Sequence, residues 1–111
     1  MWRDRAHLES IAQSCERIVG KTLGRTFEDF ANSEDLHDIV ALHIAIIGES
    51  ARKLSDETKE KLSEIPWHKV IGMRNRIAHD YKATDSREIW IAATRDIPEL
   101  LVVVSRELDR P

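Results

Sequence analysis

The stretch PWHKVIGMRNRIAHDY, residues 66–81, predicts a helix that carries both packing and chemistry. Proline suits the first turn of a helix, and apolar side chains recur at helical spacing from there on. One stripe of this helix holds Trp67, Val70, Ile71, Arg74, Ile77, Ala78 and Tyr81. A guanidinium on an apolar stripe is costly to bury alone, so we expect Arg74 to meet an anion, a carboxylate or a cleft.

The opposite face of the same helix is polar and holds Gly72, Asn75, Arg76 and His79. His79 follows Arg74 by five residues, which is about 140° around an ideal helix. One straight helix therefore cannot aim both side chains at the same phosphate. Either the helix ends near Ala78 and turns His79 round, or a second chain brings its own copy opposite and makes a composite cleft.

The rest of the chain also has the pattern of helices, which predicts an all-α fold. Apolar periodicity indicates long helices over residues 4–21, 34–54 and 85–108, and Gly20 and Gly24 are expected to end the first. Shorter polar segments at residues 27–33 and 56–65 are expected to be helical too. We therefore expect five to six helices, packed as an antiparallel bundle in one domain over residues 1–111.

Capping residues and one proline mark the ends of these helices. N-caps are expected at Thr26, Ser33, Ser55 and Asp85, the last in an Asp-x-x-Glu pattern with Glu88. Pro98 falls inside the last helix and predicts a kink near Thr94 or Arg95.

The composition bounds the class of protein. A chain of 111 residues buries only a modest core, so self-association or partners would help it. Its 17 basic and 20 acidic side chains give a net charge of -3, which argues against a general nucleic-acid coat but allows a local basic site. A single cysteine excludes an intrachain disulfide, and MWRDRAHLES lacks the apolar segment of a secretory signal. No apolar run is long enough for a membrane span, so we expect a cytoplasmic protein with no membrane partner.

Other prominent residues have structural interpretations. None of the five histidines pairs with another at the i, i+4 spacing of helical metal ligands, so neither a metal nor another cofactor is expected. His43 is expected to be a hydrogen-bonded core histidine, and Cys15, Trp67 and Trp90 are expected to be core or interface residues. The acidic stretch of residues 28–38 is expected to be a solvated face, and docking of a basic partner is its alternative use.

The motif Arg-x-x-x-x-His-x-Tyr, formed by Arg74, His79 and Tyr81, resembles the signature of the HepT toxins of the HEPN superfamily. The resemblance extends over nearly the whole chain. RDRAHLESI is similar to the opening helix of the family, and IIGESARKLS resembles its internal IIGEAA helix. IPWHKVIGMRNRIAHDY, DSREIW and RDIPELL then follow in the order and spacing of the family.

One stretch departs from the family pattern. Many relatives carry an arginine in the helix before IIGE, whereas IVALHIAIIGES carries His43 and no arginine. Glu49, in the same stretch, is a candidate ion-pair partner for an arginine of the motif.

The resemblance implies a HEPN-type helical bundle that works as a homodimer, with two Arg-His motifs facing a shared cleft. It implies a toxin of a bacterial or archaeal toxin-antitoxin module that acts as a metal-independent ribonuclease. The implied antitoxin is an MntA-like minimal nucleotidyltransferase, which transfers AMP from ATP onto the tyrosine of the motif, here Tyr81.

The residue types of the motif suit that chemistry. Cleavage of RNA without a metal needs a base for the proton of the 2′-hydroxyl group and a cation for the phosphate. An imidazole such as that of His79 can shuttle the proton, and Arg74 can bind two phosphate oxygens at once. We expect Asn75 to orient the phosphate or the imidazole, and Arg76 and Lys82 to attract the RNA backbone.

AMP on Tyr81 would add a negative phosphate and a bulky base beside these groups, so it should neutralise the cation and block the cleft. The alternative function is a non-catalytic dimeric binding module that forms a complex with a nucleotidyltransferase through the same face. That alternative gives no reason for a histidine beside the arginine.

Overall fold

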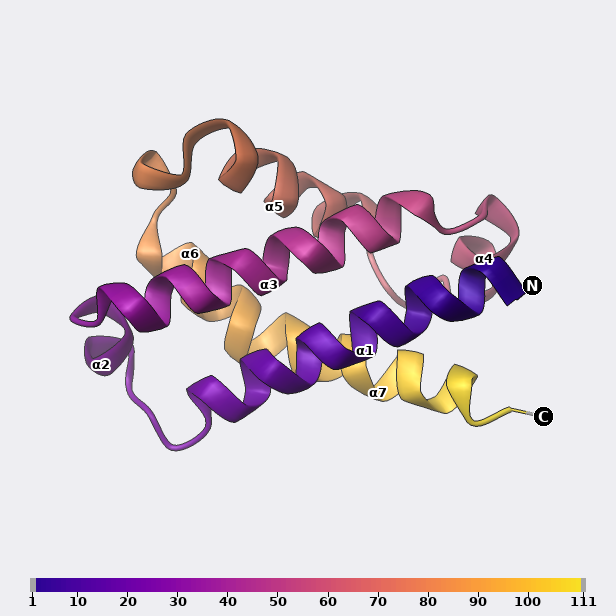
Figure 1. Cartoon of the computed structure of the whole chain (residues 1–111), viewed down its shortest axis with the longest axis horizontal. Helices are drawn as coiled ribbons and strands as arrows, with labels where there is room; N and C mark the ends of the chain where they lie inside the picture. Colours follow the sequence, from indigo (N-terminus) through magenta and orange to yellow (C-terminus); the bar gives the residue numbers. More distant parts are fainter. Residues whose placement is uncertain (1, 111) are drawn as a thin grey trace.

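The computed structural model describes residues 2–110, and over that range the chain is helical and has no strand (Figure 1). Its elements are α1 (Trp2–Thr22), α2 (Phe27–Ala31), α3 (Glu34–Lys53), α4 (Asp56–Lys61), α5 (Trp67–Asp80), the 3₁₀ turn η1 (Tyr81–Ala83), α6 (Ser86–Ile91), the π-helical turn η2 (Ala92–Asp96) and α7 (Ile97–Leu108). The all-α prediction is confirmed, and each expected helix appears. Among these described residues, no helix has the length and apolar character needed to cross a membrane.

Helix α3 is the central helix of the bundle. It packs against α1 and against α5, and α1 also packs against α7. In Figure 1, α3 lies between α1 and α5, and α5 runs back along it. Because two neighbours cover it, α3 buries residues on more than one face, namely Leu36, Val40, Ala41, Ile44, Ile47, Gly48, Ser50 and Ala51. The largest fully buried side chains of the core are Ile11, Cys15, Ile18, Phe30, Val40, Ile47, Ile89, Leu100 and Val104.

Gly48 sets the distance between α3 and α5. A Cβ atom at Gly48 would lie 2.2 Å from Cβ of Arg74 and 2.8 Å from its Cγ. It would also lie 3.2 Å from the carbonyl oxygen of Val70, so the backbone of α5 passes directly over the glycine. Because a Cβ atom cannot move without its helix, a larger residue at this position would push the two helices apart.

The N-terminal ends of the helices follow the capping signals in the sequence. The Thr26 hydroxyl accepts a hydrogen bond from the N–H of Asp29, and the Asp29 carboxylate accepts one from the N–H of Thr26, which completes a capping box. Ser33 and Ser55 cap α3 and α4 with their side-chain oxygens. These caps involve neighbours in the chain, so a local reading of the sequence could find them.

The end of the first helix corrects one expectation. Gly20 does not break α1, which continues to Thr22. A single glycine lowers helix stability by only about 1 kcal/mol, and the packing of α1 outweighs that. The break comes at Gly24, whose φ of 76° lies in the left-handed region that favours glycine.

The segment in which Pro98 predicts a kink, near Thr94 or Arg95, contains the π-helical turn Ala92–Asp96. Pro98 has no N–H group for the carbonyl of Thr94, and a wider turn accommodates that loss. The α-helical register then resumes in α7, and its buried residues are Ile97, Leu100, Val103 and Val104.

A buried carboxylate near the start of α1 accepts hydrogen bonds from the start of α4. Asp4 is 5% exposed and accepts hydrogen bonds from the N–H of Ser55 at 3.0 Å, the Ser55 hydroxyl at 2.6 Å and the Thr58 hydroxyl at 2.7 Å. Burial acts to raise the pKa of Asp4, but the hydrogen bonds from Ser55 and Thr58 outweigh it and hold the pKa below its ordinary value. The charged carboxylate is therefore the form that stabilises the fold.

We predict that Gly48→Ala lowers the free energy of unfolding by about 1–3 kcal/mol, because relief of the clash with Arg74 must separate α3 from α5. Gly72→Ala in α5 is the matched control, since a Cβ there meets no atom within 4 Å. The control should be neutral or stabilising by up to about 1 kcal/mol. Chemical denaturation measures both, and a Gly48→Ala variant as stable as the parent would contradict the close approach of the helices.

Asp4→Ala should lower the free energy of unfolding at pH 7 by about 1–3 kcal/mol, because the donors of Ser55 and Thr58 lose their acceptor. The folded pKa of Asp4 lies below its unfolded value, so its contribution is complete at neutral pH and is lost as the pH falls below about 4. Urea unfolding of parent and variant at pH 7 and pH 3 should therefore show a gap that narrows at the lower pH. Glu60→Ala, which removes an exposed carboxylate of α4, serves as the control. A gap of the same size at both values would rule out the ionised carboxylate as its source.

Candidate functional site

Helix α5 carries Arg74 and His79 of the motif, and Tyr81 begins the 3₁₀ turn η1 that follows it. The helix continues to Asp80, so His79 stays within it, and the arrangement in which the helix ends near Ala78 is wrong. The buried side chains of α5 are Trp67, Met73 and Ile77. Ala78 is exposed, because the face of α5 that meets the bundle is centred on Met73 and Ile77 rather than on Ala78.

Arg74 turns toward α3 and meets a carboxylate there. Its Nη2 lies 3.3 Å from Oε2 of Glu49, and its Nη1 donates a hydrogen bond to Oδ1 of Asn75 at 3.1 Å. The expected pairing of Glu49 with an arginine of the motif is confirmed. The Arg74 side chain remains 34% exposed, so a ligand in solution can reach it.

Glu49 is shared by three cations. Besides Arg74, its Oε1 lies 2.6 Å from Nη2 of Arg52 and 3.7 Å from Nζ of Lys53. The hydrogen bond from Arg52, together with the charges of Arg52, Arg74 and Lys53, holds the pKa of Glu49 below its ordinary value. One carboxylate among three cations leaves an excess of positive charge. The sequence reasoning missed Arg52 and Lys53, although both follow Glu49 closely in GESARK.

Arg76 points toward α6, whereas Arg74 points toward α3. It forms an ion pair with Glu88, and its Nη2 lies 3.9 Å from Sδ of Met73. Glu88 therefore does not complete the capping pattern that the sequence predicts with Asp85. Asp85 still caps α6, since its side chain accepts a hydrogen bond from the N–H of Arg87 at 2.9 Å.

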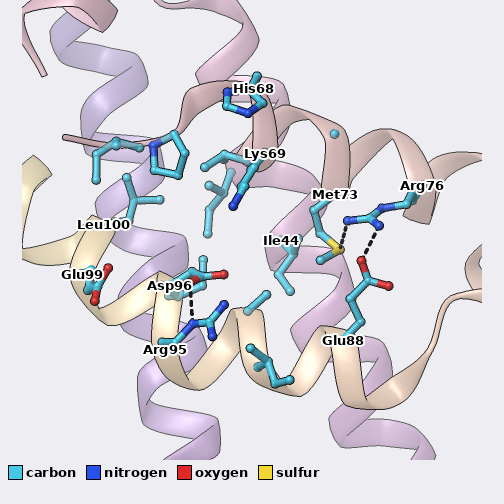
Figure 2. Close-up of a pocket in the computed structure, with 18 residues that line it drawn as sticks. Ile44, His68, Lys69, Met73, Arg76, Glu88, Arg95, Asp96, Glu99 and Leu100 are labelled. Carbon is cyan, nitrogen blue, oxygen red and sulfur yellow. Dashed lines mark hydrogen bonds and ion pairs between the residues drawn. The ribbon is translucent and has the colours of Figure 1, made fainter. Parts of the chain in front are cut away.

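The ion pair of Arg76 lies at the rim of a groove between α5 and the α6–α7 segment (Figure 2). The groove has a volume of about 770 Å³. Its apolar lining includes Ile44, Met73 and Leu100, and charged side chains such as Lys69 and Asp96 surround it. Arg74 and His79 are not among its lining residues, so the groove is separate from both.

His79 and Lys82 lie exposed near the C-terminal end of α5. Neither side chain has a hydrogen-bonding or ion-pairing partner among residues 2–110. Because α5 is helical through His79, this side chain stays about 140° around the axis from Arg74. A single chain thus brings Arg74 to Asn75 but does not bring it to His79, Arg76 or Lys82.

Tyr81 folds back onto the first turns of α3. Its hydroxyl donates a hydrogen bond to Asp38 and lies 2.5 Å from Nδ1 of His37. Nε2 of His37 lies 3.1 Å from the hydroxyl of Ser86. Burial comes first among the causes that raise the pKa of Tyr81, followed by the hydrogen bond and charge of Asp38 and the charge of Glu34. The phenol is therefore protonated at neutral pH.

The acidic stretch of residues 28–38 is only partly the solvated face that the sequence predicts. Its carboxylates are exposed, but Phe30 is fully buried and packs against Trp90 with ring centroids 5.3 Å apart. His37 and Asp38, which hold Tyr81, were missed because they lie in this stretch. The one signal in the sequence was a histidine within a run of carboxylates.

Two further residues have the structural roles expected of them. His43 is half-buried, and its Nδ1 lies 3.0 Å from the hydroxyl of Ser14 on α1. The residue that departs from the family pattern therefore faces α1 rather than the motif. Cys15 is fully buried, and burial raises the pKa of its thiol to about 12. Within residues 2–110, no three His, Cys, Asp or Glu side chains converge in a way that could hold a metal ion.

The chain matches a known family over most of its length. A family model described as "Ribonuclease HepT-like" matches residues 11–107. The chain is 38% identical over 96 residues to "Putative RNase TTE0752" of Caldanaerobacter subterraneus subsp. tengcongensis, and the match covers 86% of each protein. It is 34% identical over 94 residues to "Probable ribonuclease HepT" of Thermococcus cleftensis, with 85% of this chain and 86% of that one covered. No solved structure matches the chain. The chain belongs to the HepT-like ribonuclease family.

Proposed function

We propose that this chain is a ribonuclease toxin of a toxin-antitoxin module and that it acts on RNA in the cytoplasm without a metal ion. Membership of the HepT-like family and the names of its relatives support the activity. The observation that carries the proposal is the partly exposed Arg74 in a cluster of three cations around Glu49. A concentration of guanidinium and ammonium groups of this kind suits the phosphates of an RNA strand.

In the proposed reaction, Arg74 and His79 act on the same phosphodiester. His79 takes the proton of the 2′-hydroxyl group, whose oxygen attacks the neighbouring phosphorus to form a 2′,3′-cyclic phosphate. The bond from phosphorus to the 5′-oxygen breaks, and that oxygen takes a proton from water and leaves as a hydroxyl group. Arg74 binds the phosphate oxygens as negative charge builds on them. Asn75 accepts a hydrogen bond from Arg74 and so orients its guanidinium. Arg76 and Lys82 add positive charge for the backbone of the RNA.

The proposed active site is a composite of two chains. Arg74 and His79 lie on one unbroken helix about 140° apart, so one chain cannot direct both at one phosphate. A homodimer that brings two copies of α5 together would place Arg74 of one copy opposite His79 of the other. The sequence left two arrangements open, and the continuation of α5 through His79 supports the one with two chains.

The proposed switch is AMP on Tyr81, transferred from ATP by a cognate MntA-like nucleotidyltransferase antitoxin. Tyr81 begins the 3₁₀ turn that follows α5, so it comes directly after the helix that carries Arg74. Both residues contact α3, Arg74 through Glu49 and Tyr81 through Asp38. In this proposal, the phosphate and the nucleoside on Tyr81 neutralise the Arg74 cluster and obstruct the binding of RNA to it.

We expect His79→Ala to lower the rate of RNA cleavage by about 100-fold or more, because the reaction loses its base. The assay uses transfer RNA and messenger RNA with a chelator present, and the intact mass first confirms that Tyr81 carries no AMP. His79 is exposed, so circular dichroism should show an unchanged fold. His68→Ala, which removes another exposed histidine of α5, is the control and should cleave as the parent does. If the unmodified parent cuts no RNA but still binds the nucleotidyltransferase, the chain is the binding module and not an enzyme.

A mixture of two inactive variants tests the composite site. Arg74→Ala and His79→Ala homodimers should each be inactive, whereas mixed dimers should hold one intact site. With free exchange, about a quarter of the parent activity should return, since half of the dimers are mixed and each has one good site of two. Co-expression of the two variants ensures exchange, and the same RNA assay gives the activity. A mixture as inactive as its components would show that each chain holds its own site or none.

A further inference from the structure

Three side chains around Tyr81 form a directed chain of hydrogen bonds. The Tyr81 hydroxyl donates to Asp38, so Nδ1 of His37, at 2.5 Å from the same oxygen, is left to act as a donor. Nε2 of His37 is then the acceptor of its ring and accepts a hydrogen bond from the Ser86 hydroxyl, 3.1 Å away. With this tautomer of His37, each proton in the series of hydrogen bonds has one acceptor.

The same side chains are held in place before any ligand arrives. The His37 ring packs between two aromatic rings, with centroids 5.0 Å from Phe30 and 5.3 Å from Tyr81. His37 and Asp38 lie in the first turns of α3, whose start is capped by Ser33. Asp38 is also exposed, so its carboxylate can exchange a proton with water.

A phenol must lose its proton as its oxygen forms a bond to a phosphorus atom. From α3, the charged groups that face Tyr81 are Asp38 and Glu34, and with burial they raise its pKa. Very little phenolate therefore exists at neutral pH. Attack by Tyr81 needs a base in contact with the hydroxyl, and such a base accelerates reactions by about 10²- to 10⁴-fold.

We propose that Asp38 is the base that activates Tyr81 for nucleotidylation, and that His37, oriented by Ser86, donates the hydrogen bond that steadies the developing phenolate. This inference rests on the proposed modification of Tyr81. The Tyr81 oxygen forms a bond to the α-phosphorus of a nucleoside triphosphate, the bond from that phosphorus to the bridging oxygen breaks, and pyrophosphate leaves. The phenolic proton passes to Asp38, which then releases it to water. The chain thereby supplies both the nucleophile and the base, and the partner supplies the bound triphosphate.

The first test needs no partner, because Tyr81 is the only tyrosine of the chain. N-acetylimidazole acetylates phenols, so the mass of the peptide that contains Tyr81 gives the rate. We expect the rate of the parent to stay nearly level between pH 7 and pH 9, since Asp38 takes the proton. In Asp38→Asn only the phenolate reacts, so the rate should fall at least 10-fold at pH 7 and rise about tenfold per pH unit.

Two further variants separate a base from a nearby charge. Glu34→Gln removes the other carboxylate that acts on Tyr81 without touching its hydroxyl, and its rate should match that of the parent. Asp38→Glu keeps a carboxylate and should recover much of the lost rate. If Asp38→Asn reacts as fast as the parent, or faster, Asp38 merely restrains the phenol and the inference is overturned.

The second test measures AMP transfer to the full chain by a co-expressed MntA-like nucleotidyltransferase with ATP and Mg²⁺. Asp38→Asn should gain AMP at least 10-fold more slowly than the parent, and Tyr81→Phe should gain none. Equal rates for parent and Asp38→Asn would overturn this inference alone. A parent that gains no AMP would overturn the inference together with the proposed switch, while RNA cleavage by the same sample would leave the proposed ribonuclease standing.

Discussion

The close contact between Gly48 and Arg74 is the constraint on which the rest of the structure depends. It brings the backbone of α5 against α3, so that side chains from α5 and from the turn after it reach groups on α3. At one end of this contact Arg74 reaches Glu49, and at the other end Tyr81 reaches Asp38. Both ends of the motif are therefore positioned by one line of contact between two helices.

The two ends of that contact have opposite charge, and the electrostatics of α3 explain why. Acidic residues occupy the first turn of α3 and basic residues its last turn, which complements the helix dipole at each end. Because α5 runs back along α3, Tyr81 meets the acidic end and Arg74 the basic end. Asp38, in the turn that follows the first, extends the acidic end of α3 to the phenol of Tyr81, and Arg52 and Lys53 in the last turn add a basic surface beside Arg74.

Local signals in the sequence predicted most of the fold. Thr26, Ser33 and Ser55 cap helices through neighbours in the chain, so the sequence alone could identify them. Gly20 was wrongly expected to end α1, because the packing of the helix outweighs a single glycine. Likewise, Ala78 was placed on the buried stripe, but the position of α3 decides which face of α5 is covered.

The sequence named candidate residues for the site but did not reveal their contacts. The motif indicated Arg74 and Tyr81, yet the contacts of Tyr81 join residues more than 40 positions apart, and no periodicity reveals such pairs. The unbroken course of α5 through His79 was also a matter of tertiary structure, since the sequence allowed the helix to end earlier.

The hydrogen bond from Tyr81 to Asp38 means that AMP on Tyr81 would change the surface of the chain. An esterified oxygen has no proton to donate, and its phosphate would face the Asp38 carboxylate with like charge. The side chain would then lose the contact that holds the turn Tyr81–Ala83 against α3. Modified and unmodified chains would differ in outline at this end of the bundle, so a binding partner could tell them apart by shape without touching the nucleotide.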